Sequence, residues 1–410
     1  MRKLRILLLA VLLVPALASA KTLEDLLVEK GVITKGEARA AMAGGDGAKV
    51  YWNNGTRIEF PSEGFAAQIN TLIRTRYTFT DYDEDVGTSN TSGFDVTDAR
   101  IMVSGNALHN EFSYYLNADM VGSEDSTGAK SPALLDAYIA WQACDWASVQ
   151  MGQSKTGFGR QYNTSEQYLQ FADRSNVSDY FTSASDGNIG LGRQAGALAK
   201  TTWADGQLML NAGIFNGEST GEGINRSAVD TRHTGVVTLR WNVMGDINSY
   251  QESDIDWTED WAASLGASYA YSDRGGSDAN QDSIAVDANA KYQGFSFNAE
   301  YFVATVDPDE GDSLEPNGFY AQAGYFFQPK ELELAARYGY LDCDNGTASG
   351  QCTGLDNVNE VGVSINYYWW KHNLKGQIGY DLLNQDVRGL SGDSSNVNTS
   401  RWLVQLSSYF

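Results

Sequence analysis

Histidines and serines are the first residues to examine for catalysis in this chain of 410 residues. A serine hydrolase needs a serine within hydrogen-bond reach of a histidine, and a third group that orients the histidine. The three histidines are His109, His233 and His372, and no recognisable motif surrounds any of them. The sequence also has no metal-ligand cluster, phosphate-binding glycine loop or dinucleotide fingerprint. We therefore expect no catalytic residue, no bound metal, no cofactor and no enzymatic activity.

Two arginines spaced two residues apart suggest a different chemistry. Arg74 and Arg76 lie in the stretch GFAAQINTLIRTRYTFT, where apolar and polar residues alternate. Residues two apart in a strand point to the same side, so both guanidinium groups project from the polar face. Together with Arg100, they would form a row of cations that attracts anions in a water-filled lumen. Alternatively, these arginines pair with acids such as Asp98 or Asp119 and only satisfy the wall.

The basic candidates for a lumen or constriction fall into two groups. One group lies in or beside the long polar segment 154–191, and the other lies on the polar faces of alternating stretches. The complete set is Arg74, Arg76, Arg100, Lys155, Arg160, Arg174, Arg193, Arg240 and Arg337. To line a lumen, these residues must be positioned by a sheet whose polar face surrounds water.

Alternation of apolar and polar residues recurs along most of the chain. It is clear in EFSYYLNADMV, ELELAARYGYL and VNEVGVSINYYWW. Several such stretches exceed ten residues, whereas strands of globular proteins usually have five or six. We predict strands near 65–80, 94–107, 111–121, 134–142, 147–153, 192–203, 206–216, 232–244, 259–272, 283–292, 294–306, 317–328, 330–341, 358–370, 373–384 and 399–410. An even number of long strands predicts an all-β fold, a 16-stranded antiparallel transmembrane β-barrel.

The predicted connections alternate between long and short. Every second one, such as 81–93 or 154–191, is long and rich in Asp, Gly, Ser and Asn. The others, such as Gln328-Pro329, are tight turns. Long outer loops with short inner turns are typical of outer-membrane barrels. One inner connection, 245–258, is longer than this rule allows, and it is either an elaborated turn or an element missed by the prediction.

The residues before the alternating region have a different pattern. MRKLRILLLAVLLVPALASA has a basic start, a short apolar run and a small-residue cleavage site. It predicts a secretory signal peptide over residues 1–20. Helical periodicity then predicts a short periplasmic helical segment over 21–45. The outer-membrane β-barrel is expected as the domain 56–410.

The last ten residues, RWLVQLSSYF, end the chain inside an alternating pattern. Trp402 and Phe410 share the apolar parity. We expect this strand to close the barrel, with both side chains in the lipid-facing aromatic girdle. A terminal Phe on such a strand also resembles the signal by which outer-membrane proteins are recognised for assembly.

Charge and cysteine content limit the partners. A formal net charge of −23 argues against nucleic-acid binding, which needs a basic surface. Acidic loops such as DYDEDVG are expected to be solvated, or to hold divalent cations that bridge to lipopolysaccharide. Cys343 and Cys352 flank the polar loop DNGTASGQ. A local disulfide is the favoured interpretation in an exported chain, and a zinc pair is the weaker one. Cys144 has no predicted partner, and we expect it to be inert.

Residues 99–193 resemble the phosphate-selective porin O and P family of Gram-negative bacteria. The resemblance is carried by ARIMVSGNALHNEFSYYLNADM, LLDAYIAWQACDWASVQMGQSKTGFG, EQYLQFADRSNVSDYF and GRQAG. The N-terminal LEDLLVEKGVITKGEA is similar to the helical preface of many such porins. The resemblance implies a trimeric channel whose third outer loop, 154–191 in this chain, folds into the lumen and constricts it. Acids such as Asp173 and Asp179 interleave the basic residues of this loop, so the sequence leaves the ion preference open.

We therefore expect an outer-membrane porin of a Gram-negative bacterium, through which small ions and solutes diffuse passively. Anions such as phosphate are candidate permeants. Expected partners are inorganic anions or small solutes, outer-membrane lipid and lipopolysaccharide, the barrel-assembly machinery and, from the resemblance, two further copies in a homotrimer. The alternative function is a secreted soluble all-β adhesin or glycan-binding protein, which would have shorter strands and a second apolar sheet face.

Overall fold

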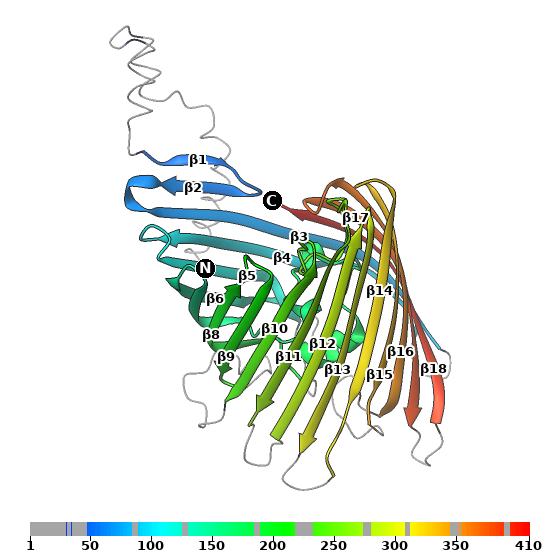
Figure 1. Cartoon of the computed structure of the whole chain (residues 1–410). Coiled ribbons are helices and arrows are strands. Elements are labelled where there is room, and N and C mark those ends of the chain that lie inside the picture. Colours follow the sequence, from blue (N-terminus) through cyan, green and yellow to red (C-terminus); the bar gives the residue numbers. More distant parts are fainter. Residues whose placement is uncertain are drawn as a thin grey trace, which may run out of the picture.

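Sixteen antiparallel strands, β3 to β18, follow one another around a closed barrel (Figure 1). The computed structural model describes residues 30, 34, 47–83, 89–124, 130–183, 189–217, 233–273, 280–307, 312–344, 352, 354–388 and 394–410. Each strand pairs with the next along the chain, and β18 pairs with β3 from Thr399–Tyr82 to Tyr409–Leu72. The closing pair removes the open edge that a sheet would otherwise expose.

The predicted 16-stranded barrel is confirmed, and every predicted strand is present. The strand ends differ from the predicted ones by at most five residues, at the start of β18. The strands are β3 (Phe65–Tyr82), β4 (Thr91–Ala107), β5 (Phe112–Glu124), β6 (Lys130–Cys144), β7 (Ala147–Lys155), β8 (Arg193–Trp203), β9 (Leu208–Phe215), β10 (Thr234–Met244), β11 (Ala262–Ser272), β12 (Asn280–Tyr292), β13 (Phe295–Asp307), β14 (Asn317–Gln328), β15 (Leu332–Asp342), β16 (Leu355–Trp370), β17 (Leu374–Arg388) and β18 (Ser394–Tyr409).

The two faces of the wall differ as the alternation predicts. In β10, Thr238 and Arg240 are buried on the inside, whereas Val237, Leu239 and Trp241 are exposed on the outside. Backbone groups in lipid must be satisfied by the ladder itself, and the outward side chains must be apolar. The outer surface of the barrel wall is therefore apolar, and its inner surface is polar.

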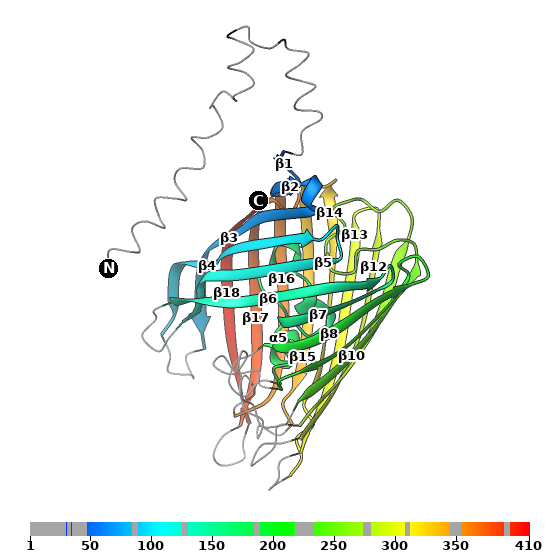
Figure 2. The same ribbon diagram turned by 90° about the vertical axis from the view of Figure 1, so that its left-hand side faces the viewer.

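A hairpin that the sequence interpretation missed lies at the inner end of the barrel, the end that holds the chain's C-terminus (Figure 2). Its strands are β1 (Lys49–Trp52) and β2 (Thr56–Phe60), followed by a short turn, η2 (Pro61–Glu63). β2 pairs with Phe65–Ile69, the part of β3 that β18 does not reach. The hairpin thus covers an edge of β3 that would otherwise be open.

The predicted N-terminal segments lie almost wholly outside the described residues. This applies to the signal peptide (1–20) and to the helical segment (21–45), apart from Lys30 and Thr34. Helical turns occur instead in the middle of the chain, at α4 (Arg160–Asn163), η4 (Glu166–Tyr168) and α5 (Asn176–Thr182). In the described part of the chain, no helix has the length and apolar character to cross a membrane.

Two connections do not remain at the ends of the barrel. The third outer loop, 156–192 between β7 and β8, carries the three helical turns, and α5 lies within the ring of strands in Figure 2. The inner segment, 245–261 between β10 and β11, also enters the lumen, since residues 251–255 are all buried. The long 245–258 connection is therefore an elaborated inner connection and hides no additional strand.

Candidate functional site: the lumen

The third outer loop turns into the lumen directly after β7. Gly157 and Gly159 have φ angles of 95° and 69°, a region that favours glycine because it has no Cβ. Further along, the Ser175 side chain accepts a hydrogen bond from the backbone N–H of Ser178 at 3.1 Å and so caps α5. These local signals allow a short helix to sit inside the barrel.

An apolar patch on the inside of the wall seats α5. Phe181 of α5 stacks on Phe302 of β13, with ring centroids 5.0 Å apart. The surrounding buried cluster includes Val177 and Tyr180 of α5 itself, Tyr320 and Leu341 of the wall, and Cys343 and Cys352 beyond the outer end of β15. Burial of this apolar area stabilises the loop against the β13–β16 side of the barrel.

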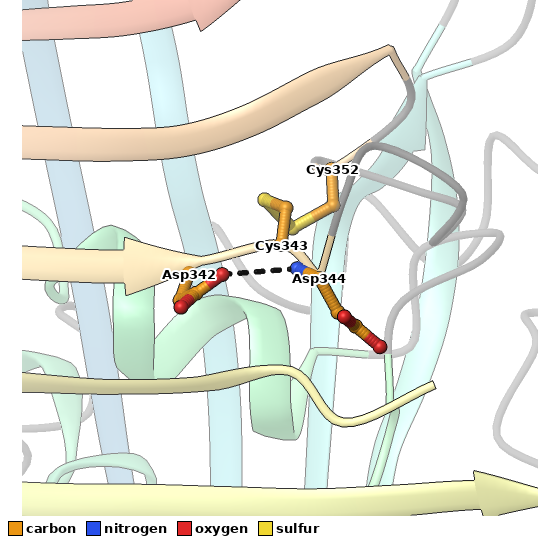
Figure 3. Close-up of a disulfide and its surroundings, with 4 residues drawn as sticks. All are labelled: Asp342, Cys343, Asp344 and Cys352. Atoms are coloured by element: carbon orange, nitrogen blue, oxygen red, sulfur yellow. Dashed lines mark hydrogen bonds between the residues drawn. A yellow bond between two sulfur atoms is a disulfide. The ribbon is translucent and has the colours of Figure 1, made fainter. Parts of the chain in front are cut away.

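The Cys343–Cys352 pair belongs to this seat. The two cysteines form a disulfide with a sulfur–sulfur distance of 2.03 Å at the outer end of β15 (Figure 3). The N–H of Asp344 donates to the Asp342 carboxylate at 3.1 Å beside it. Both cysteines are fully buried, so the bridge joins Cys352 to the outer end of β15 within the apolar cluster under α5. Cys144 is a free thiol.

Arginines of the wall bind the part of the loop that precedes α5. Arg74 donates to the carbonyl of Ala172 at 2.8 Å, and Arg76 pairs with the Asp173 carboxylate at 2.7 Å. Arg401 of β18 reaches the same carboxylate at 3.0 Å. Burial alone would raise the pKa of Asp173, but Arg76 and Arg401 together hold it well below its usual value. The loop is thereby anchored to the strands that close the barrel.

A second ion cluster forms around Glu166 of η4. Arg100 of β4 contacts its carboxylate at 2.5 Å, and Arg174 of the loop contacts it at 2.9 Å. Burial opposes the charged form of Glu166, yet the two guanidinium groups keep the pKa of Glu166 far below its usual range. Arg100 also pairs with Asp98 of the same strand and with Asp119 of the neighbouring strand β5.

Two cavities remain beside the loop, and Glu166 lines both. The outer cavity, of about 250 Å³, is lined by Arg74, Arg174 and Arg401 and by four carboxylates. The inner cavity, of about 400 Å³, runs along β4 to β9 toward the inner rim. Four basic side chains and two acidic ones line it: Arg100, Lys155, Arg193, Lys200, Asp136 and Glu166. The loop thus narrows the lumen and leaves these two cavities on either side of Glu166.

Comparison with known proteins identifies this architecture. The sequence model of the phosphate-selective porin O and P family matches residues 69–407. The chain belongs to this family. The porin is therefore a Gram-negative outer-membrane channel for small solutes and not an enzyme, and the alternative of a soluble adhesin is set aside. No curated protein matches the sequence.

Solved structures similar to this porin show the same fold. The anion-selective porin from Comamonas acidovorans is 12% identical, with a TM-score of 0.61, over 84% of this chain and all of the other. The outer-membrane channel DcaP of Acinetobacter baumannii is 14% identical, with a TM-score of 0.55, over 84% and 97% of the two chains. OprB of Pseudomonas putida, at high pH, is 9% identical, with a TM-score of 0.52, over 85% and 95%.

Five of the nine basic residues selected from the sequence line a cavity of the porin. These are Arg74, Arg100, Lys155, Arg174 and Arg193. Arg193 is bound by Asp136 at 3.0 Å, so its charge is largely compensated. The predicted row of Arg74, Arg76 and Arg100 is likewise compensated, because Arg74 and Arg100 pair with Asp98, and Arg76 pairs with Asp173.

The other four basic candidates line neither cavity. Arg76 is directed to Asp173, and Arg337 is directed to the Glu360 carboxylate at 2.5 Å. Arg240 forms a bidentate pair with Asp287. Arg160 is completely buried and donates to the Tyr320 hydroxyl at 2.9 Å. These residues hold the wall and the loop together.

The charged lumen residues that the sequence interpretation missed include Glu166, Lys200 and Arg401. Arg401 shares the polar parity of Gln405 in β18, so alternation alone could have identified it. Lys200 is likewise on the inward parity of β8, two residues from the buried Leu198. Glu166 carries no sequence signal, because its position depends on the path of the loop.

At the barrel's closing strand, Trp402 is 54% exposed on the outer wall, with its ring 4.6 Å from that of Tyr380. Phe410 exchanges backbone hydrogen bonds with Thr71 of β3. The Phe410 ring lies 5.8 Å from that of Trp370, at the inner rim. The last strand therefore ends in an aromatic cluster.

Proposed function

We propose that this porin favours small anions such as chloride and phosphate, and that the preference arises in the inner cavity. The observation that carries the proposal is the charge of the lining, where four cations face two carboxylates. The outer cavity has three cations and four carboxylates, so it adds no anion preference of its own. An anion that crosses the inner cavity therefore meets more cationic than anionic side chains on its lining.

The two lysines of the inner cavity are the cations with the least compensated charge. Lys155 donates to the carbonyl of Thr164 at 3.3 Å and faces the Tyr162 ring at 5.5 Å. Lys200 faces the Tyr138 ring, with its Nζ 5.8 Å from the centroid. In the part of the chain that the structure describes, neither lysine is in an ion pair, whereas Arg100 and Arg193 both are. The lysines can therefore attract a passing anion.

The test is the reversal potential of the porin in a planar bilayer that separates two salt concentrations. Lys200→Gln should lower the anion-to-cation permeability ratio by about fivefold at about 0.1 M salt. Lys371→Gln is the matched control, because Lys371 is exposed at the inner rim and pairs with Asp256. An unchanged ratio in Lys200→Gln, or an equal change in both variants, would reject the inner cavity as the source of anion preference.

We also propose that the porin assembles as a homotrimer, as its family resemblance implies. An apolar groove of about 740 Å³ on the outer wall supports this, since it crosses the barrel closure between β16 and β4. Phe94, which is 89% exposed, lines this groove. A second copy would cover this side chain more completely than mobile lipid does.

Native mass spectrometry in detergent tests the assembly. The wild type should give three times the mass of one chain, and Phe94→Asp should shift the population toward single barrels. Ile139→Asp is the control, because Ile139 is 61% exposed on the outer wall and does not line the groove. A wild-type protein that stays a single barrel at all concentrations would contradict the proposal.

A further inference from the structure

The inner segment, 245–261, reaches the third outer loop inside the lumen, although the two enter from opposite ends of the barrel. The backbone N–H of Glu252 donates to the carbonyl of Tyr168 in η4 at 3.2 Å. The Glu252 carboxylate accepts from the backbone N–H of Gln170 at 2.7 Å and from the Gln161 side-chain amide at 2.9 Å. One residue of the inner segment therefore makes three hydrogen bonds to the loop.

The remainder of the inner segment is fixed to the wall. The Asp254 carboxylate accepts from the backbone N–H of Gly294, in the β12–β13 turn, at 2.7 Å, and from that of Thr258, within the segment itself, at 3.0 Å. The Ser253 hydroxyl donates to Glu333 of β15 at 2.9 Å. Ile255 packs in a small buried cluster with Phe326 and Tyr368. Glu252 is thus presented to the loop from a rigid base.

Burial makes the Glu252 carboxylate dependent on the loop. It is completely buried, and the nearest cation, Arg160, is 3.9 Å away and itself belongs to the loop. A buried carboxylate is costly unless hydrogen bonds satisfy it. Among the residues that the structure describes, its donors at hydrogen-bond distance are Gln161 and Gln170, and both belong to the third outer loop. The Glu252 carboxylate is therefore stable in this buried position only when the loop is in place.

We infer that the inner segment is a strut that positions the constriction from the periplasmic side, with Glu252 as the positioning residue. The contact at Tyr168 lies two residues from Glu166, the side chain that lines both cavities. Without this support η4 would move, so the width of the passage beside Glu166 would fluctuate. The inference rests on the proposed path through the inner cavity, but it does not depend on which ion the porin prefers.

The experiment records open-channel current in planar bilayers for Glu252→Ala, Glu252→Gln and the wild type. Glu252→Ala removes both carboxylate contacts and should increase open-channel current noise. Glu252→Gln retains one acceptor oxygen and should have a smaller effect in the same direction. The control is Asp256→Ala in the same segment, because Asp256 is exposed and pairs with Lys371 rather than with the loop. Quiet, wild-type currents from folded Glu252→Ala and Glu252→Gln would overturn the inference.

Trypsin sensitivity of the folded protein in detergent is an independent measurement. Arg160 and Arg174 are buried or nearly so in the loop, and cleavage after them requires the loop to leave its seat. Loss of two hydrogen bonds should speed cleavage roughly tenfold or more in Glu252→Ala, and less in Glu252→Gln. Asp256→Ala should match the wild type. Equal cleavage of all four proteins would show that Glu252 does not hold the loop. Failure of the Lys200→Gln test would instead concern ion preference alone.

Discussion

Glu166→Gln is the sharpest test of how charge in the lumen acts on permeating ions. The Glu166 side chain lines both cavities and is held by Arg100 at 2.5 Å and Arg174 at 2.9 Å. The amide has nearly the shape of the carboxylate. Arg100 keeps Asp98 and Asp119, and Arg174 keeps the carbonyl of Thr164. The substitution should therefore remove one negative charge and weaken this ion cluster, while the contacts of Arg74, Arg76 and Arg401 keep the loop in the lumen.

The size of the effect follows from the geometry of the passage. A unit charge about 5 Å from a monovalent ion changes its energy by about 0.8 kcal/mol in water, and screening at about 0.1 M salt leaves about 0.5 kcal/mol. This energy is a change of about 2.3-fold for each ion, favourable for anions and unfavourable for cations. The anion-to-cation permeability ratio of Glu166→Gln should rise by about fivefold.

Reversal potentials in a salt gradient measure this ratio directly. Glu63→Gln is the matched control, because it makes the same substitution at an exposed residue of η2 that lines neither cavity. The shift should shrink as salt is raised, since the Debye length falls to about 3 Å at 1 M. If Glu166→Gln folds, as shown by its altered gel mobility after boiling, and its ratio equals that of Glu63→Gln, Glu166 does not face the ion path.

Three further predictions concern pH, the disulfide and the chain end. The folded-state pKa of Glu166 is depressed, so the contribution of this carboxylate to stability is fully present above the usual carboxyl pKa of about 4.3. That contribution is lost as the pH falls through the lower folded-state pKa. Trypsin resistance of the loop should therefore be constant from about pH 8 to 5 and decline only below that range. Replacing both Cys343 and Cys352 by Ser should lower the stability of the outer end of β15 by about 2–3 kcal/mol. Urea titration of the purified barrel measures this loss, and an unfolding midpoint equal to that of the wild type would contradict the prediction. Phe410→Ala should reduce the amount of folded barrel in the outer membrane more than Trp402→Ala does, as measured by heat-modifiable gel mobility, and equal amounts would argue against a terminal assembly signal.

The barrel could be predicted from sequence because each wall strand repeats one physical constraint over many residues. In β14 the predicted range, 317–328, and the observed one coincide. The hairpin at 49–60 was missed because its strands have only four and five residues, too few for alternation to stand out. Its turn nevertheless carries a local signal: Asn54 has a φ angle of 52° and precedes Gly55, the dipeptide most typical of hairpins.

The lumen was only partly predictable, because parity selects a face and not a partner. Alternation correctly directs Arg74 inward, and the register of β3 and β4 places Asp98 opposite it. The pairing of Arg76 with Asp173 joins residues 97 positions apart, and it exists only because a loop crosses the lumen. Contacts of this kind depend on barrel closure and loop path, neither of which has a periodic signature in the sequence.

The inner segment shows why polarity is a poor guide inside such a barrel. The stretch NSYQESDIDWTED resembles a solvated acidic turn, yet Glu252 and Asp254 within it are buried. In a soluble domain, a segment that enters the core must be apolar, because the core provides few hydrogen-bond partners. The inside of a porin wall is already lined with donors such as Asn298 and Lys291, which bind backbone carbonyls of this segment. A polar segment can therefore fold inward as readily as outward. Only the length of this connection, at least twice that of a tight turn, distinguishes it in the sequence from the other inner connections.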